Sequence, residues 1–361
     1  MSMDTLFKIK DIDRYCYENY LKGYLPNNII DIHTHVWLSK FKKKVVNPSL
    51  RSVQWPHMVA AENSIEEMLL SYELMFPGKK ITPLIFSSFG KHDDIEASNN
   101  YIVESSEKAQ VPALLYTPPW WSGEELENRI ISGNYLGIKV YLNLAPDYIP
   151  ADEIRVYDFL PPHQLEIIDK LGQIVMLHIP RKERFKDRVN LEQVLEIHNK
   201  YKNIKVIIAH VGRAYCNSDL GDAFSFLKNA DRLLYDFSAN TNSYVFKSLI
   251  KSVGVKRILF GSDMPITRMR MRRIERDGKY INLVPKGLYG DLSNEKNMEE
   301  LDGEDAERLT LFMYEELKSF REASIECNLN DNDLEDIFFN NAYKLIKGIQ
   351  PNRKFRFDSV I

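Results

Sequence analysis

The chain has 361 residues, of which 44% are hydrophobic and 27% are charged, and its formal net charge is -3. This composition is that of a soluble globular protein and gives no electrostatic preference for nucleic acid or acidic membranes, so neither partner is predicted. The length allows one large α/β barrel or two ordinary domains.

The cysteines and the first residues bear on location. Cys16, Cys216 and Cys327 are odd in number and far apart, which argues against a disulfide framework or a cysteine zinc site. The first 20 residues contain no apolar signal core, and the sequence nowhere has the ~18 uninterrupted apolar residues of a spanning helix. We therefore expect a cytoplasmic protein without a membrane segment.

Eight short apolar runs alternate with segments of helical periodicity. The runs are 28–35, 81–88, 111–117, 136–142, 173–179, 204–210, 232–239 and 256–263. Several are apolar almost throughout, as strands covered on both faces must be. Between them, six segments carry apolar residues at a spacing of three to four, which predicts the covering helices. These segments are 64–76, 98–110, 123–133, 161–172, 190–201 and 243–254.

Alternating strands and helices predict an α/β fold of the TIM (β/α)8 barrel type. A barrel of the usual ~250 residues leaves room for an N-terminal helical extension at 1–27 and an insertion at 264–330 within a barrel domain of residues 28–361. We expect the extension to cover the barrel floor or a neighbouring subunit, and the insertion to hold an arginine cluster followed by an acidic helical section. The alternative is an open doubly wound sheet, but the glycine-rich phosphate turn that it requires is absent from the sequence.

Four of the eight histidines and one aspartate stand at the ends of predicted strands. His33 and His35 end the first run, His178 the fifth, His210 the sixth and Asp263 the eighth. Carboxyl ends of barrel strands form one catalytic face, and residues two apart in a strand point the same way. Imidazoles with one carboxylate suit a divalent metal such as zinc, with a water completing a catalytic site. The pair His33 and His35 alone is weak evidence for a metal site, because buried histidines often bond backbone groups. The joint placement of five metal-competent side chains at strand ends favours a metal site.

Seven motifs carry a family resemblance: DIHTHVW, GIKVYL, VMLHIPR, VIIAHVGR, LLYDFSA, ILFGSDMP and IFFNNAYKLI, in this order over residues 28–347. The sequence resembles the amidohydrolase superfamily, and within it the amidohydrolase 2 family related to aminocarboxymuconate-semialdehyde decarboxylase. The resemblance implies that His33, His35, His178 and Asp263 bind one divalent ion, Zn²⁺ in the first place and Mn²⁺ as the alternative. It also implies that His210 lies beside the metal-bound water as acid, base or electrophile.

Lys139, in GIKVYL, leaves the number of metal ions open. Binuclear members of the superfamily carry a carbamylated lysine on strand four that bridges two ions. Lys139 shares its parity with Tyr141, so it is able to face the barrel interior. The related mononuclear group also has a lysine here, and we therefore expect an interior lysine paired with a carboxylate or the substrate. One ion is predicted, with two as the alternative.

Aromatic residues near the ends of the first and third strands suggest a wall for a flat organic ligand. These are Trp37, Trp55, Tyr116, Trp120 and Trp121. Equally, loop tryptophans often only pack the loops down.

Arginines offer a carboxylate clamp through their planar guanidinium groups. Arg213 follows His210 by three residues, and Arg268, Arg270, Arg272 and Arg273 follow Asp263. We expect one of them to reach the site and the others to be solvated or ion-paired. The residues predicted to contact substrate are Trp37, Trp121, Tyr141, Arg213 and Arg268.

The leading functional hypothesis is a metal-dependent hydrolase acting on a small carbonyl compound, with Asp263 passing a proton from water to the leaving group. The alternative is metal-dependent, non-oxidative decarboxylation of an aromatic or enol acid, with His210 or Asp263 protonating carbon. A third hypothesis, a barrel that binds without catalysing, would predict a missing ligand, and none is missing. The expected partner is a small carboxylate-bearing substrate. A homo-oligomer is compatible with the fold by analogy.

Overall fold

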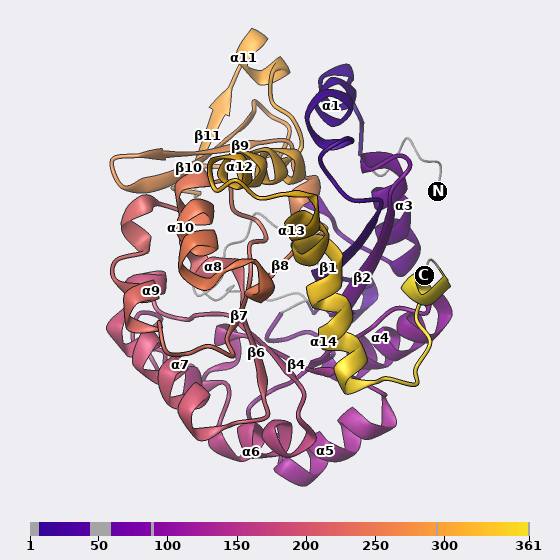
Figure 1. Ribbon diagram of the computed structural model, residues 1–361, viewed down its shortest axis with the longest axis vertical. Coiled ribbons are helices and arrows are strands. Elements are labelled where there is room, and N and C mark those ends of the chain that lie inside the picture. Colours follow the sequence, from indigo (N-terminus) through magenta and orange to yellow (C-terminus); the bar gives the residue numbers. More distant parts are fainter. Residues whose placement is uncertain (1–6, 44–58, 88–89, 294, 360–361) are drawn as a thin grey trace.

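The computed structural model describes residues 7–43, 59–87, 90–293 and 295–359. It shows a mixed α/β fold in which parallel strands lie inside a layer of helices (Figure 1). The parallel strands are β1 (Asn28–His35), β2 (Lys80–Phe86), β3 (Leu115–Tyr116), β4 (Gly137–Val140), β5 (Ile174–Leu177), β6 (Lys205–Ile208), β7 (Leu234–Asp236) and β8 (Ile258–Leu259).

The strands form two parallel sheets that are joined at both edges. One sheet pairs β1 with β2, and the other runs from β3 to β8 in sequence order. At the first junction, the amide of Leu114 donates to the carbonyl of Ile85 at 3.0 Å. At the second, the amide of Ile32 donates to the carbonyl of Phe260 at 2.9 Å, and that of Asp263 to the carbonyl of His33 at 2.8 Å. Each strand therefore neighbours the next, and β8 returns to β1.

The six helices predicted between the strands are all present. They are α3 (Ile65–Met75), α4 (Ile95–Ala109), α5 (Gly123–Ser132), α6 (Pro162–Leu171), α7 (Arg188–Lys200) and α10 (Ser243–Val253), with the short α8 (His210–Arg213) and α9 (Ala223–Phe226) between them. Several begin at a side chain that accepts a free backbone N–H of the first turn, as Ser64, Ser122 and Asn242 do. No helix within the described residues has the length and apolar content needed to cross a membrane.

Alternation along the strands divides the apolar residues between two cores. The side chains on one face of the strands, which include Ile30, Ile32 and Met176, form an inner cluster. The side chains on the other face, which include Ile138 and Val175, belong to a second cluster together with residues of the covering helices. Strands covered on both faces explain why the runs are nearly continuous in apolar residues.

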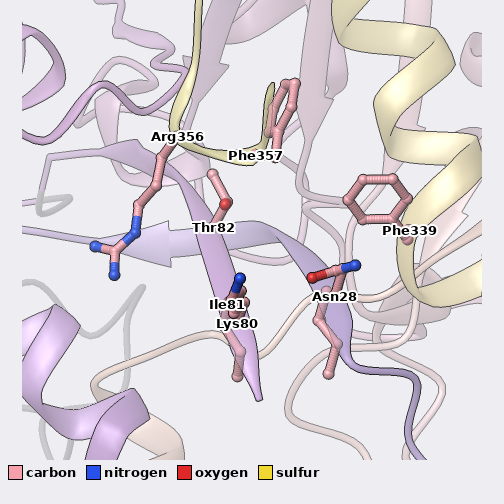
Figure 2. A pocket seen from close by; sticks show the side chains of 8 residues that line it. Asn28, Lys80, Ile81, Thr82, Phe339, Arg356 and Phe357 are labelled. Carbon is pink, nitrogen blue, oxygen red and sulfur yellow. The ribbon is translucent and has the colours of Figure 1, made fainter. Parts of the chain in front are cut away.

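The C-terminal segment covers the amino ends of the strands. Phe339, α14 (Asn341–Ile349) and Phe357 pack against the inner cluster. Figure 2 shows Phe339 and Phe357 beside Asn28 and Thr82, around a cavity of about 220 Å³. Among the described residues, the inner cluster contains residues of this C-terminal segment and none of the N-terminal extension. The alternative, that the extension contacts a neighbouring subunit, stays a prediction.

The N-terminal helix instead packs near the segment that follows β8. It consists of α1 (Asp11–Cys16) and a π-helical turn, Tyr17–Leu21. The ring of Tyr17 lies against Phe76 and Tyr314, and Asp13 forms a buried ion pair with Arg270. Figure 1 shows α1 at the same end of the molecule as the insertion.

The insertion folds partly as a sheet, which the sequence analysis did not predict. Its elements are β9 (Arg272–Arg276), β10 (Lys279–Pro285), β11 (Met298–Leu301), α11 (Gly303–Glu307) and α12 (Phe312–Glu326), followed by α13 (Asp331–Glu335). In β10, Tyr280, Asn282 and Val284 are buried while the residues between them are not. This period of two is that of a strand with one covered face.

Candidate metal centre

The structure brings together the five strand-end residues predicted to form a metal site. Their side chains are all buried, and their candidate ligand atoms fall into two groups, in each of which all atoms lie within 4.8 Å of one another. One group is His33, His178 and His210, and the other is His33, His35 and Asp263. Because His33 belongs to both, the five side chains form one continuous cluster.

Three of the four histidines have a fixed tautomer. The Nδ1 atom of each faces an oxygen that carries no hydrogen, so Nδ1 holds the proton and donates it. The contacts are His33 to Asp236 Oδ2 at 3.0 Å, His35 to the carbonyl of Ser87 at 2.9 Å and His210 to the carbonyl of Ser238 at 3.0 Å. The Nε2 atoms of these histidines therefore present lone pairs to the cluster, as metal ligation requires.

His178 completes the imidazole set. Its Nε2 lies 2.7 Å from Nε2 of His210, and its buried Nδ1 has no hydrogen-bond partner among the described residues. Burial lowers the pKa values of both His178 and His210, and the positive charge of Lys139 lowers them further. Neutral imidazoles are the form that binds a metal ion.

Asp263 contributes the negative charge. Its Oδ1 is buried, makes no hydrogen bond of good geometry within the described part of the chain, and lies 3.3 Å from His35 Nε2 and 3.6 Å from His33 Nε2. Burial raises the pKa of this carboxyl, whereas positive charge on the surrounding imidazoles, His35 first, lowers it to about 2. A carboxylate facing imidazole lone pairs is favourable only with a cation or a proton between them, so the donor set fits a divalent metal ion.

Asp236, at the end of β7, holds two of these histidines and was missed as a functional residue. Its Oδ2 accepts from His33, and its Oδ1 accepts from the amide of His210 at 2.9 Å and from the amide and hydroxyl of Ser238 at 3.1 and 2.5 Å. Burial would raise its pKa, but His33 and the other donors lower it. An aspartate ending the otherwise apolar run LLYD was the available signal.

The segment after β8 lies close against His33. Asp31 accepts from the amides of His33 and Ser262 at 3.2 and 2.9 Å, and from the hydroxyl of Tyr72 at 2.7 Å. At Gly261, an added Cβ would lie 2.8 Å from the Cβ of His33. Glycine is therefore required there for β8 to approach the histidine.

Lys139 points from β4 into the cluster. Its Nζ lies 3.3 Å from His33 Nε2 and 4.8 Å from the ring centroid of Phe86. Burial lowers its pKa to about 7. The ring of Tyr141 stacks on His178 with a centroid distance of 4.7 Å. Both residues thus border the candidate metal centre.

The predicted tryptophans take other positions. The indole of Trp37 donates to the carbonyl of Ala61 at 3.1 Å. Trp121 belongs to the outer core, with Arg129 4.1 Å above its ring, while Trp120 is exposed. Trp55 lies outside the described residues. Within the described part of the chain, the contacts of Trp37 and Trp121 are made to residues outside the histidine cluster, and their predicted roles toward substrate stay predictions.

Two aromatic side chains sit nearer the cluster. Tyr116 is buried beside Tyr141 and Leu144. It thereby extends the aromatic wall that Tyr141 begins.

One predicted arginine lies near the cluster. Arg213 donates to the carbonyls of Ile179 and Pro180 at 3.1 and 3.2 Å, and its charge contributes to the lowered pKa of His178. The four arginines after Asp263 have partners elsewhere. Arg268 donates to Ser71, Arg270 pairs with Asp13, Arg272 with Glu315, and Arg273 donates to Asn282 and the carbonyl of Ala239.

The sequence model of the amidohydrolase family matches residues 30–347. This chain belongs to that family. No curated protein matches this amidohydrolase in sequence.

Solved structures of similar fold include hydrolases and decarboxylases. A probable 2-pyrone-4,6-dicarboxylic acid hydrolase from Acinetobacter baumannii, with citric acid bound, has a TM-score of 0.55 at 15% identity, covering 88% of this chain and 99% of that one. The 2,6-dihydroxybenzoate decarboxylase from Rhizobium has a TM-score of 0.53 at 13% identity, covering 89% of this chain and 99% of that one. A dihydroxybenzoic acid decarboxylase from Polaromonas sp. JS666, with bound manganese and 2-nitroresorcinol, has a TM-score of 0.52 at 13% identity, covering 89% of this chain and 97% of that one. At these identities the likeness establishes the shared fold.

Proposed function

We propose that this amidohydrolase is a metal-dependent hydrolase that acts on a lactone, amide or ester of a small organic acid through a metal-activated water. Its catalytic domain would be a TIM barrel of residues 28–361, preceded by the extension 1–27. The proposal rests on one observation above all. Three buried imidazoles have Nδ1 pinned to an acceptor, so their Nε2 lone pairs face a site that also contains an ionised Asp263.

Four residues would hold the ion: His33, His35, His178 and Asp263. A bound ion would supply Lewis acidity and lower the pKa of a water from 15.7 to roughly 7, with Zn²⁺ the first choice and Mn²⁺ the second. We propose a single ion, as the resemblance to the mononuclear group implies, with Lys139 beside it as an interior lysine 3.3 Å from His33 Nε2. A carbamylated Lys139 bridging two ions is the alternative.

The other steps belong to side chains of the cluster. Asp263, as an ionised carboxylate, would take the proton of the attacking water and deliver it to the leaving group, so that no net proton is consumed. His210, whose Nε2 lies 2.7 Å from Nε2 of His178, would accept a hydrogen bond from the attacking water through its Nε2 lone pair and so orient that water. Arg213 would orient a substrate carboxylate, and Tyr141 would pack against the carbon skeleton.

Metal content and turnover together test this proposal. We expect about one equivalent of zinc or manganese in the purified protein and hydrolysis of at least one compound in a panel of lactones, esters and amides of organic acids. His33→Gln should lose the metal, and Asp263→Asn should lose most turnover. The control is His198→Gln, since His198 is also buried but lies on α7 outside the cluster. If Asp263→Asn retains both metal and full turnover, the proposal fails.

Decarboxylation of an aromatic or enol acid is the second candidate. Two of the similar structures are dihydroxybenzoate decarboxylases, one of them with bound manganese. In this chain two basic side chains, Lys139 and Arg213, border the histidine cluster and would suit a carboxylate substrate. Carbon dioxide release from dihydroxybenzoates, without hydrolysis of any lactone or ester, would favour this function over the first.

The cellular setting is proposed from the cysteines. All three are free thiols, two of them buried. We place the enzyme in the cytoplasm on this basis, acting on a soluble, carboxylate-bearing small molecule.

A further inference from the structure

A second pocket lies between the N-terminal segment and the insertion, and none of its lining residues belongs to the histidine cluster. Its volume is about 540 Å³, within the range of small-molecule sites. Phe7 and Lys8 line it from the N-terminal side, and Arg268 and Leu288 from the segment after β8. The pocket therefore shares no lining residue with the proposed metal centre.

The charges around this pocket are unbalanced. Among the described residues that line it, five are basic and none is acidic. Three of the five have a carboxylate partner of their own: Lys10 with Glu307 at 3.1 Å, Arg270 with Asp13 at 2.5 Å and Lys286 with Asp302 at 3.1 Å. Lys8 and Arg268 have no ion pair within the described part of the chain. The pocket thus carries two positive charges that have no paired carboxylate among the described residues.

Arg268 is the more informative of the two, because it is only 5% exposed. One terminal nitrogen donates to the hydroxyl of Ser71 at 3.1 Å, and Nε has no hydrogen-bond partner among the described residues. Glu67 acts on Arg268 only at longer range, and burial lowers the pKa of the guanidinium to about 10. A buried charge satisfied by one neutral hydroxyl is costly, and a carboxylate or similar anion would offset that cost.

The remaining wall is apolar. Phe7, Leu288 and Leu311 line the pocket, and Leu288 is 54% exposed although it is a large hydrophobic residue. The guanidinium of Arg268 lies 5.9 Å from the ring centroid of Phe7, so the charged and apolar parts of the wall adjoin. An occupant with both an anionic head and an apolar body would match them.

We propose that this pocket is a binding site for a small amphipathic carboxylate. The carboxylate lies against Arg268, with Lys8 contributing at longer range, and the ring or short hydrocarbon lies against Phe7 and Leu288. The site is independent of the chemistry at the metal centre.

Calorimetric titration of the full-length protein with 2-naphthoate tests the proposal, with neutral 2-naphthamide as the matched ligand. Arg268→Gln removes the buried charge. Leu288→Glu places a negative charge at an exposed position of the pocket wall, where folding is not at risk. Arg272→Gln is the control from the same arginine cluster, because Arg272 is half-exposed and paired with Glu315. Asp263→Asn alters the metal centre and no residue of the pocket.

We expect naphthoate binding to weaken at least tenfold in Arg268→Gln and in Leu288→Glu, and to remain within twofold in Arg272→Gln and Asp263→Asn. Naphthamide should bind at least tenfold more weakly than naphthoate. If Arg268→Gln does not fold, Leu288→Glu decides. Absence of naphthoate binding, equal binding of the amide, unchanged binding in Leu288→Glu, or loss only in Asp263→Asn would each overturn the proposal, the last because binding would then occur at the metal centre.

Discussion

Asp236→Asn is expected to weaken metal binding by reversing a single hydrogen bond. The carboxylate is fully buried and uses both oxygens, with Oδ1 accepting three hydrogen bonds from His210 and Ser238 and Oδ2 accepting one from His33. In the variant, the three donors keep the amide oxygen at the Oδ1 position. The amide NH₂ must then take the place of Oδ2, 3.0 Å from Nδ1 of His33.

The consequence falls on the opposite side of the imidazole ring. Facing a donor, Nδ1 of His33 has to accept, so the proton of the neutral ring moves to Nε2, the atom directed at Asp263 and Lys139. A protonated Nε2 cannot be a ligand until the tautomer is restored. Losses of such supporting partners usually cost 10- to 100-fold in metal affinity, which corresponds to about 1.4 to 2.8 kcal/mol.

Competition with a chromophoric chelator measures the affinity for zinc and manganese directly, and urea denaturation of both proteins measures stability. Asp219→Asn is the matched control, because Asp219 is also buried and accepts from Arg184 and from the amides of Tyr215 and Cys216. The control should lose stability but keep its metal affinity. An Asp236→Asn protein that folds and binds metal as tightly as the unmodified chain would refute the tautomer argument.

Three further outcomes are expected. Gly261→Ala should lower both the melting temperature and the metal affinity, because the new Cβ would lie 2.8 Å from the Cβ of His33. An unchanged metal affinity would show that β8 moves aside without cost. Glu316 is buried with Oε1 lacking a hydrogen bond among the described residues, and burial raises its pKa well above 4.5. The folded state then holds a proton that the unfolded state releases above about pH 4.5, so this group's contribution to stability falls as pH rises, by at most ~1.4 kcal/mol per pH unit. Glu316→Gln should therefore gain in melting temperature relative to the unmodified chain more at pH 8 than at pH 5, and a pH-independent difference would contradict this. Removal of bound metal by a chelator should lower the melting temperature, and adding zinc or manganese should restore it, because a ligand at 100 times its Kd stabilises the folded state by about 2.7 kcal/mol. An unchanged melting temperature in protein shown to have lost its metal would argue against a metal site in the folded protein.

The strand-end residues of the centre were predictable because their placement depends on local rules. His33 and His35 are two apart in a strand, and strand periodicity alone puts them on one side. The six covering helices were predictable for the same reason, since their apolar spacing is local. Asp236 also ends a recognisable strand, but its role depends on which atoms lie within 3 Å of it across the fold, and residues 203 positions apart carry no sequence signal of that contact.

The arginines show where local rules stop. Arg268 lies only five residues beyond Asp263, which made it a reasonable candidate for the same site, yet its guanidinium reaches Ser71 on α3. The backbone explains the difference, because Asp263 adopts a φ of 60° and the chain turns sharply after β8 before entering the insertion. His210 has a similar φ of 54°, and Arg213, three residues later, stays near the cluster. The left-handed conformations of His210 after β6 and Asp263 after β8 end the strand periodicity on which a prediction would rely. Strained backbone positions of this kind are common at functional sites, where they set the direction of a side chain. The position of a residue relative to a strand therefore predicts its direction only up to the first such turn.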